Sequence, residues 1–408
     1  MKKTTTPPYK ILYCEQNIDG TVGGSYYCLL ELTTALDRDI YEPAVIFYTD
    51  NFLIPKFRAA GIQTSIFKCS RSVNFTRYFE SMPLLSGIAT TLLRPAQKAL
   101  NVIIRVIITG IRYAWYLKKN NIDIVHLNNS ILYNHDWMFA ARLCGIRCIT
   151  HERGINTHFP AIARYFARHL DAVISISQAV TNNMAERGVP MDNVITIYDG
   201  IDPSRLIINS NPDQVRTKYQ INKSDRIIGV VGNVKPWKGQ ETVVRAMANI
   251  TKQFPTLRCL IVGATSDNDY VEQLHEIREK LGLTDNIIFT GFQENVADYM
   301  NAMDIVIHSS IDPEPFGIVL VEAMALKKPL IATKIGAPLE IVVNGDTGLL
   351  VPPNDPDSLA EAVIYILENP DLAQAMVTKA YDRLHDKFIL SKNSDQIQAV
   401  YHNLLKKE

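Results

Sequence analysis

The segment DIVIHSSIDPEPFGIVLVEAMALKKPLIATKIGAPLEIV, residues 304–342, decides the fold. An apolar run ends at His308, and a loop with two prolines around Glu314 follows it. The prolines stiffen this loop and favour a helix that starts near Gly317. A second apolar run, Pro329–Ala332, comes after the helix. A strand, a helix and another strand in this order predict a parallel βαβ unit.

The same alternation of short apolar runs and amphipathic stretches continues along the whole chain. Each half repeats it with Gly, Asp or Asn where the runs end, as expected of parallel strands joined by helices. We therefore predict an α/β protein with two doubly wound, Rossmann-like domains that face each other across a cleft. The expected strands are Lys10–Cys14, Ala44–Phe47, Ile122–Leu127, Arg147–Thr150, Ala172–Ile176 and Val194–Ile197 in the first half, and Ile227–Val231, Leu257–Val262, Ile287–Thr290, Ile305–His308 and Pro329–Ala332 in the second.

The boundary between the two domains is predicted in the segment YDGIDPSRLIINSNPDQ, residues 198–214. This segment is rich in Pro, Asp, Asn and Ser, as linkers between domains are. We expect an N-terminal domain over residues 1–203 and a C-terminal domain over residues 204–385. A last helix within residues 386–408 is expected to pack back on the N-terminal domain.

The composition is that of an ordinary globular protein. The 408 residues include 47% hydrophobic and 21% charged residues, which excludes disordered, collagen-like and disulfide-scaffold proteins. The 42 Lys and Arg residues balance the 42 Asp and Glu residues. Because a general nucleic-acid binder would carry a net positive charge, we expect no nucleic-acid partner.

Cysteine usage and the N-terminus indicate the cytoplasm. The six cysteines form no C-x-x-C pair and lie in apolar runs, which is typical of reduced, buried thiols. The first residues, MKKTTTPPYK, lack the apolar region of a signal peptide. No stretch of 18 uncharged apolar residues occurs, so we expect no membrane-spanning helix.

The balanced total hides a basic window. Residues 51–120 contain eleven Lys and Arg residues against one acidic residue, a net charge of +10. Four of the basic residues fall on one stripe of an apolar helix at 100° per residue: Arg94, Lys98, Arg105 and Arg112. A basic amphipathic helix can lie on an anionic membrane surface. The alternative is a helix that packs on the sheet with its basic stripe in solvent.

Two glycines after the first expected strand mark a possible anion site. Gly23 and Gly24 lie in EQNIDGTVGGSYYCLLEL, between that strand and the following helix. Glycine lets a ligand approach the backbone, and a helix N-terminus attracts an anion. A tight turn between strand and helix explains the same residues. The dinucleotide fingerprint G-x-G-x-x-G and the Walker P-loop are absent, which disfavours an NAD-dependent dehydrogenase.

The opening segment places two carboxylates eight residues apart. Glu314 lies in the loop at the end of a strand, and Glu322 lies on the helix that follows. The backbone N–H groups of Phe316, Gly317 and Ile318 lie between them. N–H groups suit a phosphate and carboxylates suit sugar hydroxyls, so this arrangement fits a nucleotide sugar. A helix cap plus a surface charge is the alternative interpretation.

A basic pair follows the first strand of the second half. Lys235 and Lys238 lie in the loop of IIGVVGNVKPWKGQETVVRA, between Gly232 and Gly239. Lysine is a compact point charge, which suits a diphosphate leaving group. A solvated loop charge is the alternative for either lysine.

Together these motifs resemble those of the retaining nucleotide-sugar glycosyltransferases of family 4, which have the GT-B fold. The resemblance covers most of the chain. It is carried by AVISISQAVTNNMAERGVPMDNVITIYDGID (172–202), by the loop lysine, by E-P-F-G-x-x-x-x-E-A (314–323) and by G-x-x-x-E-I-V-x-x-G-x-T-G-L-L-V (336–351). The ordered set is specific, whereas two glutamates at this spacing are modest evidence.

The resemblance assigns roles to individual residues. Lys238 would hold the donor diphosphate, Glu322 would accept hydrogen bonds from the ribose, and Glu314 would contact the transferred sugar. His151, in CITHERGIN, resembles the family's histidine beside the reacting centre. The implied catalytic residues are His151, Lys238 and Glu314, and the implied donor-binding residues are Gly23, Gly24, Gly232, Asn233, Lys235, Lys238, Phe292, Glu314, Phe316, Gly317, Ile318 and Glu322.

Two positions depart from the family pattern. The family has an arginine where this chain has Asn233, so Lys235 would have to supply the second cation. The family's asparagine before G-I-D is Asp199 here, which adds a carboxylate close to the expected diphosphate.

The resemblance also implies a mechanism and partners. It implies retention through front-face attack with the leaving phosphate as base, no metal and no cofactor; the literal Asp267–Asp269 match lies in a loop outside the expected place. The donor would be a nucleotide sugar, most simply of UDP or GDP, and the acceptor a glycan or lipid-linked molecule of cell-surface polysaccharide or glycolipid synthesis. The enzyme would be cytoplasmic and peripheral at the inner membrane face. A hydrolysing sugar-nucleotide epimerase and a non-catalytic sugar-binding protein remain alternatives.

Overall fold

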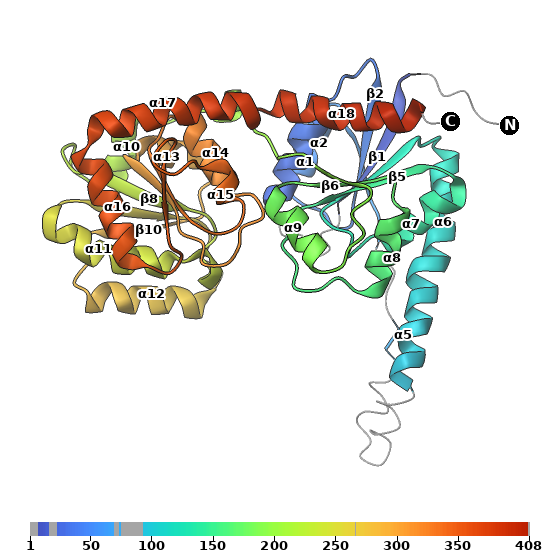
Figure 1. Ribbon diagram of the computed structural model, residues 1–408, viewed down its shortest axis with the longest axis horizontal. Coiled ribbons are helices and arrows are strands. Elements are labelled where there is room, and N and C mark those ends of the chain that lie inside the picture. The colour runs from blue at the N-terminus through green and yellow to red at the C-terminus, as the bar shows by residue number, and fades with distance from the viewer. Residues whose placement is uncertain (1–6, 16–22, 69–72, 75–92, 266, 407–408) are drawn as a thin grey trace, which may run out of the picture. The chain divides into compact units, whose positions relative to one another are not determined.

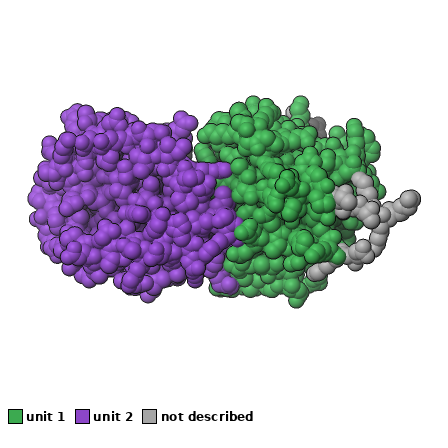
Figure 2. All heavy atoms as spheres, turned by 90° about the horizontal axis from the view of Figure 1, so that it is seen from above, with its two compact units in different colours: residues 1–176, 180–197, 394–408 green, residues 177–179, 198–393 purple. Residues whose placement is uncertain are grey.

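The computed structural model describes residues 7–15, 23–68, 73–74, 93–265 and 267–406. The chain divides into two compact units, which Figure 2 colours separately. Unit 1 comprises residues 1–176, 180–197 and 394–408, and unit 2 comprises residues 177–179 and 198–393.

Unit 1 is built on a seven-stranded parallel sheet with the order β3-β2-β1-β4-β5-β6-β7 (Figure 1). Residues Ile11–Cys14 of the central strand β1 are fully buried, as in parallel sheets covered by helices on both faces. The strands are β1 (Tyr9–Glu15), β2 (Tyr41–Phe47), β3 (Gln63–Ile66), β4 (Ile124–Asn128), β5 (Arg147–Glu152), β6 (Ala172–Ser175) and β7 (Val194–Thr196).

Helices connect these strands, and one helix returns to unit 1 from the C-terminus. Ile397, Tyr401 and Leu404 of that last helix follow the i, i+4, i+7 spacing of one helix face and are buried in the core of unit 1. The helices are α1 (Gly24–Ala35), α2 (Ile54–Ala59), α5 (Arg94–Val102), the π-helix η2 (Ile103–Ile108), α6 (Thr109–Lys119), α7 (His135–Cys144), α8 (Ala161–His169), α9 (Gln178–Glu186) and α18 (Leu390–Lys406).

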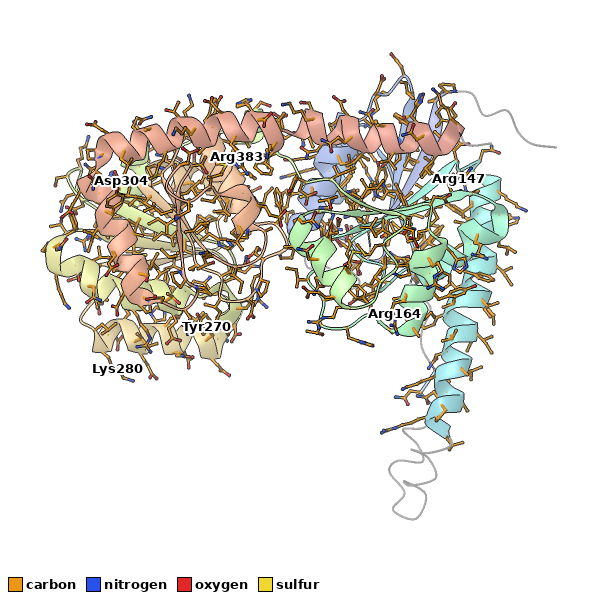
Figure 3. The ribbon with its side chains drawn as sticks, viewed as in Figure 1. Arg147, Arg164, Tyr270, Lys280, Asp304 and Arg383 are labelled. Atoms are coloured by element: carbon orange, nitrogen blue, oxygen red, sulfur yellow. The ribbon has the colours of Figure 1, made fainter. Side chains whose placement is uncertain are left out.

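Unit 2 is built on a six-stranded parallel sheet with the order β10-β9-β8-β11-β12-β13. Asp304, labelled in Figure 3, aligns its two central strands: its carboxylate accepts the Ile227 N–H at 2.7 Å and pairs with Arg226 at 2.8 Å. The strands are β8 (Ile227–Val231), β9 (Arg258–Val262), β10 (Ile287–Gly291), β11 (Ile305–His308), β12 (Leu330–Thr333) and β13 (Leu349–Val351).

Helices cover the sheet of unit 2. Val243, Met247 and Ile250 of α11 are fully buried in its core at i, i+4 and i+7. The helices are the 3₁₀ turns η3 (Pro203–Arg205) and η4 (Pro236–Lys238), and α10 (Pro212–Lys218), α11 (Gln240–Gln253), α12 (Asn268–Lys280), α13 (Val296–Ala302), α14 (Ile318–Ala325), α15 (Pro338–Ile341), α16 (Pro356–Glu368) and α17 (Pro370–Lys387).

The predicted fold class, two α/β halves with parallel sheets, is confirmed. Each of the eleven predicted strands is present. The structure contains two further strands, β3 and β13, which were not predicted. Strand β3 has no buried residue, so it lacks the apolar run that a central strand shows. The chain enters unit 2 at Tyr198 and returns to unit 1 at Ser394, within α18.

The basic window contains a helix of 26 residues, Arg94–Lys119, made of α5, η2 and α6. Five residues of α6 are buried, whereas α5 and η2 have none, and α5 extends away from the sheet (Figure 1). The alternative, a helix that packs on the sheet, is therefore wrong for α5 and η2, and α6 packs on α7, where Tyr113 stacks on Trp137 with ring centres 4.0 Å apart. The 100° spacing does not apply across the π-helical turn, but Arg94, Lys98, Arg105 and Arg112 are all exposed.

We expected no membrane-spanning helix, but Arg94–Lys119 is long and apolar enough to cross a membrane by length and composition. This test allows up to two charged residues in a window of 18, whereas the expectation from the sequence considered only stretches without any charge. Among the described residues it is the one helix that meets this test.

Candidate functional site

In each unit the strand order reverses between two central strands. These are β1 and β4 in unit 1, and β8 and β11 in unit 2. Open parallel sheets bind ligands outside the carboxyl ends of the strands at such a point. The loop after β8 carries Lys238, and the loop after β11 carries Glu314, so the reversal brings these two predicted residues together.

Lys238 and Glu314 form a two-pronged ion pair within unit 2. The Lys238 ammonium lies 2.8 Å from Oε1 and 2.7 Å from Oε2 of Glu314. Their side chains are only 20% and 12% exposed, so water screens the pair weakly. The ammonium also lies 4.2 Å from the centre of the Trp237 ring, which favours a cation.

Two further groups hold the Glu314 carboxylate, and neither was predicted from the sequence. Ser310 donates to Oε2 at 2.8 Å, and His308 Nε2 lies 3.3 Å from the same oxygen. Burial raises the pKa of Glu314, but the His308 hydrogen bond and the Lys238 charge outweigh burial and lower that pKa to about 2. Glu314 is therefore a carboxylate at neutral pH and a weak base.

Close backbone contacts fix these loops. Gly239 has φ +67°, and a Cβ there would lie 2.0 Å from the Ser309 carbonyl oxygen. Gly336 has φ +70°, and a Cβ there would lie 2.6 Å from the backbone of Glu314. Both positions require glycine because the conformation and the space exclude a side chain.

The other predicted donor residues of unit 2 lie in different environments. Glu322 is half-buried on the second turn of α14, which begins after Gly317 with φ +96°. Phe316 is buried, and its ring centre lies 6.0 Å from that of Phe388. By contrast, Phe292 is 65% exposed.

The loop after β8 holds the remaining predicted residues of unit 2. Asn233 is exposed and Lys235 is half-buried; the Lys235 ammonium has no hydrogen bond or ion pair with a residue that the structure describes. Gly232 leaves room beside Lys238, because a Cβ there would lie 4.0 Å from Lys238 Cε. Asp267 of the Asp-x-Asp match caps α12 through the Tyr270 N–H.

The predicted residues of unit 1 lie at the carboxyl edge of its sheet. His151, near the end of β5, is 1% exposed. Gly23 is the N-cap of α1, and a Cβ at Gly23 or Gly24 would meet no described residue within 4 Å. Among the described residues, therefore, nothing fills the space beside either glycine.

The same edge carries polar residues that the sequence analysis missed. Glu15 ends β1 and accepts hydrogen bonds from Asn128, at 2.5 Å, and from Asn129. Glu152 ends β5 and accepts from Ser130. Glu15 and Glu152 could have been predicted as site residues, because each lies just after an apolar run that was predicted as a strand.

Glu152 is a buried carboxyl group, and no cation of the described residues forms an ion pair with it. Burial raises its pKa to about 7, while hydrogen bonds from the Ile131 N–H, Ser130 and Asn156, at 2.9 Å each, act in the opposite direction.

Comparisons with known proteins cover both units. Residues 212–383 match the family described as glycosyl transferases group 1, and residues 22–205 match glycosyltransferase family 4. The chain belongs to the family 4 glycosyltransferases. This confirms the resemblance drawn from the motifs.

Curated relatives of this glycosyltransferase act on different molecules. N-acetyl-alpha-D-glucosaminyl L-malate synthase of Bacillus anthracis is 26% identical over 298 residues, covering 71% of this chain and 77% of the relative. Phosphatidyl-myo-inositol mannosyltransferase of Mycolicibacterium smegmatis is 31% identical over 219 residues, covering 52% of each chain. The lipopolysaccharide core biosynthesis mannosyltransferase LpsB of Rhizobium meliloti is 25% identical, covering 60% of this chain and 69% of the relative.

Solved structures share the fold over the full length. A glycosyltransferase from Rickettsia africae has a TM-score of 0.83 at 22% identity, covering 99% of this chain and all of the other. Anabaena HepE in complex with UDP has a TM-score of 0.78 at 23% identity, covering 97% and 100%. At these identities the likeness shows the GT-B fold.

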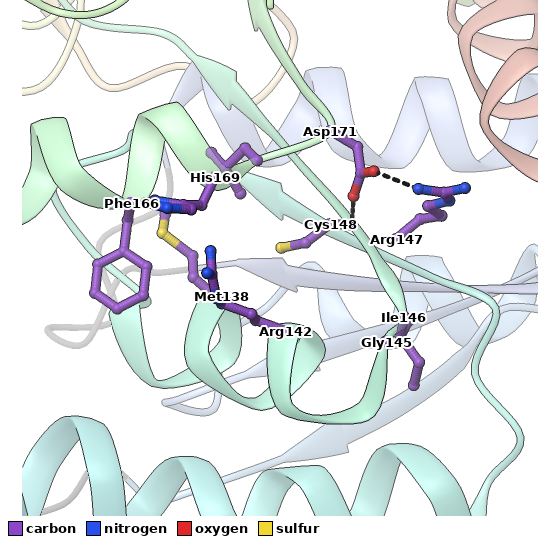
Figure 4. A pocket seen from close by; sticks show the side chains of 10 residues that line it. Met138, Arg142, Gly145, Ile146, Arg147, Cys148, Phe166, His169 and Asp171 are labelled. Carbon is purple, nitrogen blue, oxygen red and sulfur yellow. Dashed lines mark hydrogen bonds and ion pairs between the residues drawn. The ribbon is translucent and has the colours of Figure 1, made fainter. Parts of the chain in front are cut away.

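A small cavity of this glycosyltransferase lies apart from the residues above. It has a volume of about 210 Å³ and is drawn in Figure 4. Arg147 and Cys148, the first residues of β5, line it, whereas His151 and Glu152 are near the other end of that strand. Its Asp171 carboxylate is occupied by Arg147, at 2.9 Å, and by the Cys148 N–H, at 2.8 Å. The cavity therefore contains none of the predicted site residues.

Proposed function

We propose that this glycosyltransferase moves a hexose-type sugar from a UDP- or GDP-sugar to a glycan or lipid-linked acceptor, with retention of anomeric configuration and without a metal or cofactor. The observation that carries the proposal is the ion pair of Lys238 and Glu314 at the strand-order reversal of unit 2. A cation beside a carboxylate suits a ligand with a diphosphate next to sugar hydroxyls.

Each residue of the pair has one task in this proposal. Lys238 stabilises the charge that develops on the diphosphate as it leaves, in place of a metal, and Lys235 adds a second cation where the family has arginine. Glu314 accepts hydrogen bonds from the transferred sugar, and Glu322 accepts them from the ribose. Structural neighbours determined with UDP and with UDP-glucose support the nucleotide-sugar donor.

Retention in this proposal proceeds without an enzyme nucleophile. Lys238, Ser310 and His308 contact both oxygens of the Glu314 carboxylate, and its pKa of about 2 makes it a poor nucleophile. Attack from the front face, with the leaving phosphate as base, needs no such group. The anomeric configuration of the product, read by NMR, tests this step: an inverted product contradicts it.

The helix Arg94–Lys119 supports an acceptor at an anionic membrane surface. It exposes basic side chains next to large apolar ones, and contiguous exposed apolar surface marks an interaction site. A cavity of about 710 Å³, lined by Ile111, Arg112 and Trp115 among others, lies against α6. The exposed apolar residues are Leu100, Val102, Ile103, Ile107, Ile108, Ile111 and Trp115.

The names of two relatives, which contain phosphatidyl-inositol and lipopolysaccharide core, favour such an acceptor and a role in cell-surface synthesis. We place the enzyme in the cytoplasm, peripheral at the inner membrane face.

The test measures release of nucleoside diphosphate from UDP-glucose, UDP-N-acetylglucosamine and GDP-mannose in EDTA, with and without lipid and oligosaccharide acceptors. We expect release from one nucleotide class that depends on the acceptor. Release without any acceptor would support a hydrolysing epimerase instead. No release and no binding of any donor would support a non-catalytic sugar-binding protein.

A further inference from the structure

Four buried side chains of unit 1 form a continuous hydrogen-bonded chain that ends at His151. Tyr13 of β1 and Tyr401 of α18 share a hydrogen bond of 2.6 Å between their hydroxyls. The Tyr401 hydroxyl lies 2.5 Å from His126 Nδ1, on β4. His126 Nε2 lies 2.7 Å from His151 Nδ1, on β5, and the two ring planes differ by 9°. Each of the four residues is at most 1% exposed.

Both histidines are neutral at physiological pH. Burial lowers the pKa of His126 to about 3, and burial followed by the Arg153 charge lowers the pKa of His151 well below its usual value. A neutral imidazole carries one ring proton, so each histidine has one nitrogen that donates and one that accepts.

The number of protons then allows two unbroken directions for the whole chain, and a third arrangement in which Tyr13 and His126 both donate to Tyr401. The third arrangement leaves the Tyr401 O–H buried without an acceptor and is disfavoured. Each hydroxyl and each neutral ring supplies one proton, and each of the three hydrogen bonds uses one. In the first direction Tyr13 donates to Tyr401, Tyr401 to His126 and His126 to His151. In the second direction every bond is reversed.

The two directions differ in what they leave at Tyr13. The Tyr13 hydroxyl has no partner other than Tyr401 among the described residues. In the second direction Tyr13 accepts from Tyr401, and its own O–H stays buried without an acceptor. An unsatisfied buried donor costs about 1–3 kcal/mol. Tyr13 lies in the hydrophobic core of unit 1, where no ligand or water can accept its proton. The first direction instead leaves the spare proton on His151 Nε2, near the end of β5 at the carboxyl edge of the sheet, where a ligand or water can accept it, so the first direction is favoured. In the first direction His151 Nδ1 accepts, and its one proton is on Nε2.

We propose that Tyr401 and His126 are positioning residues that hold His151 as the Nε2–H tautomer, so that His151 presents a hydrogen-bond donor, and not a base, to an oxygen of the reacting sugar. This inference rests on the proposed function and on the resemblance of His151 to the family's histidine beside the reacting centre. His151 Nε2 makes no hydrogen bond with a residue that the structure describes, so it is the end of the chain that a ligand can use. Tyr401 of the C-terminal helix thereby acts on His151 through His126, which lies 275 residues away from Tyr401 in sequence.

The tautomers are measured directly by NMR on the full chain labelled with ¹⁵N in histidine. Correlations from the ring C–H protons to both ring nitrogens distinguish protonated from unprotonated nitrogen without donor or activity. The variants His126→Gln and His151→Gln assign the signals. We expect a protonated Nε2 and an unprotonated Nδ1 in both residues, and a proton on Nδ1 of His151 in the wild type would overturn the proposal.

Two matched variants test whether Tyr401 sets the direction of the hydrogen bonds in this chain of side chains. Tyr401→Phe removes the donor to His126, so both histidines should show mixed tautomers. Tyr13→Phe removes a hydroxyl of the same size from the same chain but leaves Tyr401 as donor, so the tautomers should be unchanged. Unchanged tautomers in Tyr401→Phe contradict the proposal. If Tyr401→Phe does not fold, the wild-type spectrum still decides.

Kinetics separates positioning from stability. Tyr401→Phe should lower kcat about tenfold with KM within twofold, since roughly one hydrogen bond in the transition state is lost. Tyr13→Phe should keep both constants within twofold. A wild-type spectrum as expected, combined with no donor turnover, would reject the proposed function and leave the hydrogen-bonded chain intact.

Discussion

The carboxyl edges of the two sheets carry the same kinds of side chains in opposite electrostatic states. In unit 2, Glu314 faces Lys238 and its pKa is lowered to about 2. In unit 1, Glu152 is buried, its hydrogen-bond donors among the described residues are neutral, and its pKa is raised to about 7. Burial acts in the same direction on both, so the His308 hydrogen bond and the Lys238 cation make the difference. In our proposals, the edge of unit 2 binds a charged ligand and the edge of unit 1 fixes proton positions.

Removal of the Lys238 ammonium should change the electrostatics of unit 2 most and should have the largest effect on activity. Lys238→Met should lower kcat/KM for the donor by about 10²–10³, because a preorganised charge on the leaving group is lost. The measurement is release of nucleoside diphosphate. Lys280→Met is the matched control, since Lys280 is 74% exposed on α12 of the same unit and should retain wild-type rates. Equal rates in wild type and Lys238→Met would contradict the role of the pair.

Neutralising the carboxylate of unit 2 should produce a stability difference that disappears in acid. The folded pKa of Glu314, about 2, lies below its ordinary value of 4.5, so the wild type gains about 3 kcal/mol over Glu314→Gln above pH 4.5. This gain is lost as the pH falls from about 4.5 toward 2. Urea unfolding of both proteins from pH 7 to pH 3.5 measures it. A difference that stays constant would show that Glu314 is not held as a carboxylate.

The substitution Glu152→Gln in unit 1 should change the pH dependence of stability in the opposite direction. The folded pKa of Glu152, about 7, lies above its ordinary value of 4.5, so its contribution is fully present below pH 4.5 and is lost as the pH rises through 7. The stability of Glu152→Gln relative to wild type should therefore rise by about 3 kcal/mol between pH 4.5 and pH 8. Urea unfolding at both ends of this range measures the change. A fall over the same range would remove the contrast between the two edges.

A smaller effect is expected at the basic helix of unit 1. Lys98→Ala combined with Arg105→Ala should weaken binding to phosphatidylglycerol vesicles about 30-fold at low salt, from roughly 1 kcal/mol per basic residue. Lys10→Ala combined with Lys56→Ala, on other elements of unit 1, provides a control with the same change in charge. Vesicle sedimentation measures both. Wild-type chain that stays in the supernatant, with or without vesicles, would reject the membrane surface.

Local patterns predicted most of the fold and part of the site. Apolar runs located the central strands, and the segment around Glu314 and Gly317 predicted the loop and the start of α14. The partners His308 and Ser310 were not predicted, because a hydrogen bond to a carboxylate depends on loop geometry and not on spacing. Strand β3 was missed because its side chains are exposed or half-buried.

The contact between Tyr401 and His126 was also beyond the sequence. Nothing local to either residue indicates it, because the helix that carries Tyr401 returns to unit 1 only through tertiary packing. The basic residues of Arg94–Lys119 are evident in the sequence. The π-helical turn that changes their spacing was not predicted.

The donor site of unit 2 is the central claim, and a thermal-shift panel of UDP-, GDP- and ADP-sugars in EDTA tests it most directly. A donor at 100 times its Kd should add about 2.7 kcal/mol to the stability of the wild type. We predict stabilisation by one nucleotide class, retained in Lys280→Met and lost in Lys238→Met and Glu322→Ala. No shift with any donor, or a shift that survives both of the latter substitutions, would contradict the account.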